Sequence, residues 1–133
     1  MADLIITKTA KNDIRTNLAY LKEVLLNPKA STNLADEITS EFNMLQDNPK
    51  SGPYVQDPFL AKLGFRFLLI KNYKAYYVVT EDESVQEVHI IRFLHSKMNY
   101  ESILNEELTK GYLSIIQGKG IPAEEAFNLI KRK

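Results

Sequence analysis

The sequence contains no cysteine and no tryptophan among its 133 residues. Without cysteine, the chain can have no disulfide framework, no cysteine-based metal site and no cysteine nucleophile. No apolar stretch is long enough to cross a membrane. The N-terminus, MADLIITKTAKND, has no charged leader before a long apolar run, so we expect no signal peptide and a cytoplasmic protein. No zinc-ligand spacing, phosphate loop or nucleophile elbow is present, and we therefore expect neither a metal nor a cofactor.

The chain also lacks a net charge, because 17 basic residues balance 17 acidic ones, and its pI is about 6.7. This balance argues against a strongly basic protein that binds nucleic acid without specificity. The charges are nevertheless uneven, because no acidic residue lies between Asp57 and Glu81. The basic residues of that interval are Lys62, Arg66, Lys71 and Lys74. They form either a locally positive hairpin or an ordinary solvated strand edge, where lysine discourages aggregation.

Two helices are predicted in the first half of the chain, whose length suits one domain. Before them, Leu4–Ile6 is an apolar run with the length of one strand. Thr7 or Thr9 is placed to cap the first helix, and Asn27 with Pro28 to start the second. The apolar positions follow the helical repeat at Ala10, Ile14, Leu18, Leu21 and Leu25, then at Ala30, Leu34, Ile38, Phe42 and Leu45. So short a connection makes the two helices an antiparallel hairpin.

Three strands are predicted after a loop over residues 50–58. Runs rich in Val, Ile, Tyr, Phe and Leu place them at about 60–70, 73–80 and 85–94. In the last strand, alternation puts Val88, Ile90, Arg92 and Leu94 on one face and His89, Ile91, Phe93 and His95 on the other. A sheet with apolar residues on both faces needs cover on both, and the helical hairpin supplies only one. The fold class is therefore α+β, with the hairpin on one face of the sheet.

The order and spacing of three parts of this meander resemble the RelE/ParE superfamily, the toxins of bacterial type II toxin–antitoxin modules. These parts are Gly64–Arg66, Asn72–Tyr77 and Ile90–His95, followed by Ser96–Tyr100. The resemblance extends upstream through both helices and covers residues 1–104, which we take as the toxin domain. It implies that Leu4–Ile6 joins the sheet, so that the hairpin packs on a mainly antiparallel four-stranded sheet, followed by C-terminal helices. It also implies an antitoxin protein as partner.

The resemblance implies one of two activities, and whether the chain is an enzyme stays open. RelE-like toxins cut mRNA on the ribosome when a 2′-hydroxyl attacks the neighbouring phosphate, which requires charge stabilisation and proton transfer. The residues for these tasks would be Arg66, Lys74, Arg92 and Lys97 for the phosphate, and His95 and Tyr100 for the proton. Lys74 and Lys97 stand where RNA-cutting members carry arginines, and the paired lysines of the RelE type are absent. The favoured alternative is a ParE-like inhibitor of DNA gyrase, which has no clear catalytic set.

The tail, residues 105–133, lies beyond the usual toxin pattern. A helix is predicted to continue along Leu104, Leu108, Tyr112, Ile115 and Ile116 and to end at Gly118, and another to begin at Pro122. The segments Lys110–Tyr112, Gly118–Gly120 and Ile121–Phe127 resemble the part of type II antitoxins that wraps the toxin. The tail is either an amphipathic end of the toxin's own core or an antitoxin-like arm that silences it. Its predicted anchors are Ile115, Ile116, Phe127 and Ile130.

Overall fold

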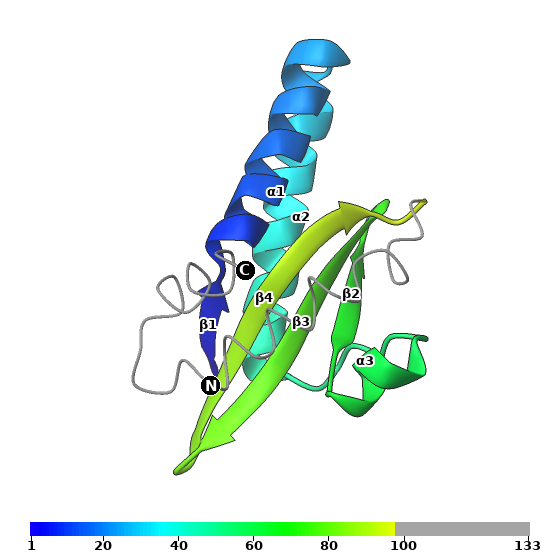
Figure 1. The fold of residues 1–133 in the computed structure, drawn as a ribbon. Helices are drawn as coiled ribbons and strands as arrows, with labels where there is room; N and C mark the ends of the chain where they lie inside the picture. The colour runs from blue at the N-terminus through cyan, green and yellow to red at the C-terminus, as the bar shows by residue number, and fades with distance from the viewer. Residues whose placement is uncertain (98–133) are drawn as a thin grey trace.

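The computed structural model describes residues 1–97, which form an α+β fold around one four-stranded sheet (Figure 1). The strands are β1 (Asp3–Ile6), β2 (Arg66–Ile70), β3 (Tyr73–Asp82) and β4 (Val85–His95). The helices are α1 (Lys8–Ala19), continued by the π-helical turn η1 (Tyr20–Val24), α2 (Pro28–Asp47) and the short α3 (Pro58–Lys62). In Figure 1, α1 and α2 lie as a hairpin on one face of the sheet and project beyond its end. The expected architecture is confirmed for these residues, and the C-terminal helices expected later in the chain lie outside them.

The sheet has the strand order β1-β4-β3-β2. The pairs β2–β3 and β3–β4 are antiparallel, whereas β1 is parallel to β4, with Ile6 opposite Ile90. The first strand therefore joins the sheet as expected, and the sheet is mixed but mainly antiparallel. Thr7 fastens the start of α1 to β4, because its N–H donates to Ile90 O at 3.1 Å and its hydroxyl to Ile91 O at 3.2 Å.

The helical hairpin starts and turns at the predicted residues. Thr7 caps α1 and Asn27 caps α2, each by accepting from the backbone N–H three residues further on. The first helix ends differently from the prediction, because the Leu25 N–H donates to Tyr20 O, five residues back, in a π turn. This wider turn shifts the helical phase. Leu25 is consequently 53% exposed and does not belong to the apolar face predicted for this helix.

The strand predicted over residues 60–70 is wrong in its first half. Asp57 Oδ1 accepts from the N–H groups of Phe59 at 2.9 Å and Leu60 at 3.1 Å, and Pro58 occupies the first turn of α3. Gly64, with a φ of 98°, follows the end of this helix and lets the chain turn into β2. An Asp-Pro pair is a helix start signal, and the apolar residues after it do not by themselves distinguish a short helix from a strand.

A bulge in β4 inverts the alternation predicted for the end of that strand. The register of β3 against β4 shifts where β4 carries one extra residue, Ile91. Beyond the bulge, Phe93 packs under the helices in the same cluster as Ile90, whereas Leu94 packs with Ile91 on the other face. The faces predicted for Phe93 and Leu94 are therefore wrong, because one extra residue turns every later side chain to the opposite side.

Both faces of the sheet carry an apolar core, as the sequence pattern requires. The first core lies between the sheet and the hairpin, and its fully buried members include Leu34, Leu45, Tyr77 and Ile90. The second lies on the opposite face and consists of Val55, Leu60, Phe65, Tyr76, Val78 and Ile91. Half of these residues come from α3 and its flanks. The face of the sheet opposite the hairpin is thus covered in part by a segment that was predicted as loop and strand.

A close backbone approach fixes the loop after α2 against the sheet. The Gly52 N–H donates to the hydroxyl of the buried Tyr77 at 2.9 Å. Burial raises the pKa of Tyr77, so the hydroxyl keeps its proton at neutral pH. A Cβ at Gly52 would clash with Phe67 O and would lie 2.6 Å from Tyr77 Oη. Only glycine fits between these groups.

Gly52→Ala should therefore destabilise the domain by about 1–3 kcal/mol, because the added methyl overpacks a buried contact. Urea unfolding would show a lower midpoint with an unchanged slope. Ser51→Ala, at the exposed neighbouring position, is the matched control and should change stability by less than about 0.5 kcal/mol. Equal stability of the two variants would contradict the close approach described here.

Candidate functional site

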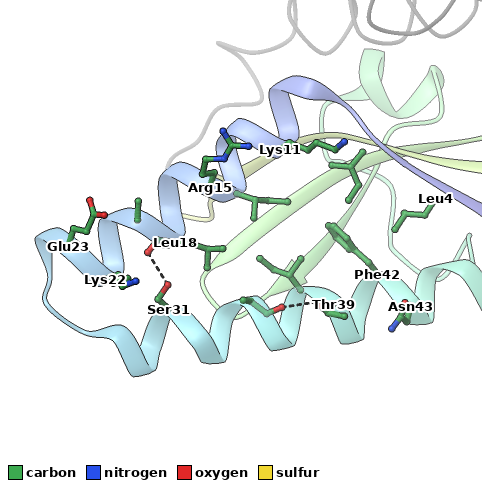
Figure 2. A pocket seen from close by; sticks show the side chains of 15 residues that line it. Leu4, Lys11, Arg15, Leu18, Lys22, Glu23, Ser31, Thr39, Phe42 and Asn43 are labelled. Atoms are coloured by element: carbon green, nitrogen blue, oxygen red, sulfur yellow. Dashed lines mark hydrogen bonds between the residues drawn. The ribbon is translucent and has the colours of Figure 1, made fainter.

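A groove of about 740 Å³ runs between α1 and α2 towards β1 (Figure 2). The two helices lie on opposite sides of it, and Leu4 and Phe42 are seen between them. Near the hairpin tip, Ser31 Oγ donates to Leu18 O at 3.0 Å and holds the helices together there. The apolar lining comes from three elements and consists of Leu4, Ile6, Ile14, Leu18, Ile38 and Phe42. Such a lining suits a ligand or a peptide segment with its own apolar face.

The rim of this groove is basic along α1. Lys11, Arg15 and Lys22 line it with exposed side chains, and Glu23 is the one acidic residue among the described lining. The α2 side contributes small or uncharged residues, namely Ser31, Ala35, Thr39 and Asn43. An apolar segment with acidic residues along one side therefore matches the groove in both polarity and charge.

Arg66, a predicted phosphate ligand, is held by backbone carbonyls. Its Nη1 donates to Gly52 O at 2.7 Å and to Lys50 O at 3.2 Å. Its guanidinium carbon lies 4.0 Å from the centroid of the Tyr54 ring, within the range of a cation–π contact. These contacts tie the loop before α3 to β2 and engage the guanidinium of Arg66.

Arg92, the second predicted arginine, forms an ion pair with α1. Its Nε donates to Asp13 Oδ2 at 2.7 Å and its Nη2 to Oδ1 at 3.2 Å. The same carboxylate accepts from the Phe93 N–H at 3.0 Å, beyond the end of β1, where β4 is paired with β3 on one side but has no strand on the other. The side chains of Arg92 and Asp13 are only 17% and 14% exposed. One carboxylate therefore serves both the guanidinium and the backbone next to the bulge.

Lys74, His95 and Lys97 lie at one end of the β3–β4 hairpin. His95 pairs with Tyr73, the neighbour of Lys74, and its ring packs edge-on against the Tyr73 ring. Lys74 Nζ lies 4.7 Å from the centroid of the Phe67 ring. The Lys97 N–H donates to His95 Nδ1 at 3.1 Å, which places the proton of the neutral imidazole on Nε2. In this arrangement the Nδ1 lone pair of His95 is engaged by the Lys97 N–H.

The structure thus brings together only part of the predicted catalytic set. Arg66 pairs with Tyr77, four residues along β3 from the partner of His95, which corresponds to about 13 Å along the strand. Arg92 is turned to α1. Tyr100 and the predicted tail anchors Ile115, Ile116, Phe127 and Ile130 lie outside the described residues.

His89 is a buried polar residue that the sequence analysis placed only on a strand face. It is 6% exposed, and its Nε2 lies 3.2 Å from Thr80 Oγ1 and 3.4 Å from Glu87 Oε1. Among the described residues, its Nδ1 has no hydrogen-bond partner. Burial lowers the pKa of His89, although Glu87 opposes this shift, so the ring stays neutral near pH 7. No spacing or motif distinguishes such a residue in the sequence.

Within residues 1–97, no group of three or more His, Asp or Glu side chains is arranged to hold a metal ion. In the same part of the chain, no helix is both long and apolar enough to span a membrane.

The family model for the ParE toxin of type II toxin–antitoxin systems, parDE, matches residues 4–100. Among solved structures, the chromosomal ParDE TA system from P. aeruginosa is 22% identical, with a TM-score of 0.56, and the match covers 71% of this chain and 96% of that chain. The YoeB/ParE toxin from Agrobacterium tumefaciens is 13% identical, with a TM-score of 0.50, over 70% of this chain and 97% of that chain. At these identities the two structures support the fold alone. None of the curated protein sequences matches this chain.

Asp13→Ala should destabilise the domain by about 2–4 kcal/mol, because it leaves the half-buried Arg92 guanidinium and the Phe93 N–H without this acceptor. Urea unfolding measures the loss. Asp36→Ala, at an exposed position of α2, is the matched control, since it shares the change in helix propensity without the ion pair. If both variants lost the same stability, the Asp13 carboxylate would not be holding α1 to β4.

Proposed function

The chain belongs to the ParE toxins of type II toxin–antitoxin systems, and we propose that it acts in the bacterial cytoplasm as a non-catalytic inhibitor of DNA gyrase. The membership covers most of the domain that the structure describes. A toxin of a ParDE system implies a ParD antitoxin as its partner. The gyrase target is the part of this statement that experiment has to establish.

The observation that carries the proposal is that the two arginines are already engaged. Arg92 is paired with Asp13 at 2.7 Å, and Arg66 is bonded to two carbonyls and stacked on Tyr54. A ribonuclease needs its cations directed at the phosphate, where charge develops in the transition state. Freeing Arg92 would leave the half-buried Asp13 unpaired, which is costly.

The remaining candidates also favour a non-catalytic toxin. Lys74 and Lys97 lack the bidentate fork with which arginine holds phosphate. His95 would have to release the Lys97 N–H before its Nδ1 could accept a proton.

One observation favours the alternative of a RelE-like ribosome-dependent mRNA endoribonuclease, which would be metal-independent. Lys74, His95 and Lys97 lie at the same end of the β3–β4 hairpin. They provide two cations and one titratable ring within a small region, and Tyr100 follows shortly in the sequence. The test below therefore separates the two activities.

We further propose that the toxin is silenced by its own tail, residues 105–133, in the manner of an attached antitoxin. The tail carries the apolar anchors Ile115, Ile116, Phe127 and Ile130, and burying one such side chain contributes roughly 1.5–3 kcal/mol. Covalent attachment gives the tail an effective concentration on the order of mM, so it competes well with a separate antitoxin.

In a supercoiling assay with purified gyrase, the chain truncated after Leu104 should reduce supercoiling or produce gyrase-dependent DNA breaks, while mRNA in a translation extract stays intact. Lys74→Ala combined with Lys97→Ala should keep this effect and should change stability by less than about 0.5 kcal/mol. Codon-linked mRNA cleavage that the double variant loses would establish the ribonuclease instead.

Bacterial growth tests the tail independently of the target. Cells that express the full chain should grow normally, whereas the chain truncated after Leu104 should stop growth. Phe127→Asp should release part of the toxicity, because a charge replaces a buried aromatic anchor. Asn128→Asp adds the same charge at a neighbouring polar position and should leave the full chain harmless. Equal toxicity of the full and truncated chains would rule out silencing by the tail.

A further inference from the structure

The groove between α1 and α2 has a distinctive charge as well as an apolar lining. Its floor is apolar, and Lys11, Arg15 and Lys22 give one rim three positive charges against Glu23. A basic segment would meet repulsion along this rim, whereas an acidic amphipathic helix would place apolar residues on the floor and carboxylates beside the cations.

Residues 101–133, which are the tail and the four residues before it, divide into two segments of opposite charge. Residues 101–116 contain three glutamates and one lysine, a net charge of −2. Residues 118–133 contain two glutamates against three lysines and one arginine, a net charge of +2. Only the first segment is complementary to the basic rim of the groove.

The lengths of groove and segment also agree. Along the helical hairpin, the groove extends from Lys11 to Glu23, a rise of about 18 Å at 1.5 Å per residue. The apolar stripe predicted for the acidic segment runs from Leu104 to Ile116, which is the same number of residues. A helix of this length would therefore reach from one end of the groove to the other.

The chain leaves the described domain close to this hairpin. Arg92, near the end of β4, is bonded to Asp13 of α1, and Asp13 neighbours the groove residue Ile14. Tyr20, at the end of α1, lies near Tyr73, the partner of His95. From Lys97 to the first apolar position of the stripe, the intervening residues 98–103 can span up to about 20 Å. An intramolecular contact requires the near end of the groove to lie within this distance of Lys97.

From charge, length and reach together, we propose that the groove between α1 and α2 binds the chain's own residues 101–116 as an acidic amphipathic helix. This inference rests on the proposed silencing by the tail and narrows it to one segment and one surface. Phe127 and Ile130, in the basic segment, then contact a different surface. With the groove filled, the same apolar floor is closed to a helix from a separate antitoxin.

Amide hydrogen exchange on the full-length chain at low salt tests the proposal without reference to gyrase. The variant Glu106→Lys with Glu107→Lys reverses the charge of the proposed segment. In this variant, the α1 and α2 peptides that line the groove should exchange about tenfold faster than in the parent chain, because no bound helix protects their amides. Glu124→Lys with Glu125→Lys makes the same charge change in the other segment and should leave these peptides as they were. Peptides of β3 serve as the internal control for folding.

A charge swap completes the test. Adding Lys11→Glu and Arg15→Glu to the first variant should restore slow exchange, since opposite charges face each other again. The proposal is overturned if the two glutamate pairs have equal effects, if neither has an effect, or if the swap fails to restore protection. Protection that disappears on dilution would assign the segment to a second copy of the chain and would also overturn it. A failure to inhibit gyrase would leave each of these outcomes unchanged.

Discussion

The ion pair between Asp13 and Arg92 joins the helical hairpin to the sheet at the point where β4 is irregular. The carboxylate accepts from the guanidinium at 2.7 Å and from the Phe93 N–H at 3.0 Å. It takes the place of a neighbouring strand just beyond the bulge, where the backbone of β4 would otherwise present an unpaired donor. Together with Thr7, which bonds to Ile90 and Ile91, it sets where α1 lies on the sheet. The groove beside α1 depends on that placement.

The same ion pair bears on the proposed function, because an Arg92 side chain bonded to Asp13 is not directed at a phosphate. Arg66 is likewise engaged, because its guanidinium donates to backbone carbonyls of the loop before α3. The groove between α1 and α2, with its apolar floor and basic rim, has instead the properties of a surface that binds a chain segment. Under the proposed function, the toxin acts through the surfaces it presents, and its control depends on what covers them.

The candidate site was less predictable from the sequence than the fold. A resemblance in order and spacing identifies the candidates Arg66, Lys74, Arg92, His95 and Lys97. Spacing alone does not show which of these side chains already has a partner. Arg92 meets a carboxylate that lies 79 residues earlier, and Arg66 meets carbonyls of a loop whose course the sequence leaves open. The groove was missed for the same reason, since its floor combines β1, α1 and α2. The burial of His89 likewise depends on neighbouring strands.

The elements that could be predicted from the sequence are those stabilised by residues close to one another along the chain. The caps at Thr7 and Asn27 bond three residues ahead, and the apolar repeat of α2 needs only the helical period. The bulge at Ile91 and the cover of the second sheet face by α3 depend instead on contacts between segments far apart in the chain. These features arise because residues far apart in the chain must share one core, and a single inserted residue reverses every face beyond it. The spacing of residues along the chain predicts local hydrogen bonds, but it does not predict the packing between distant segments.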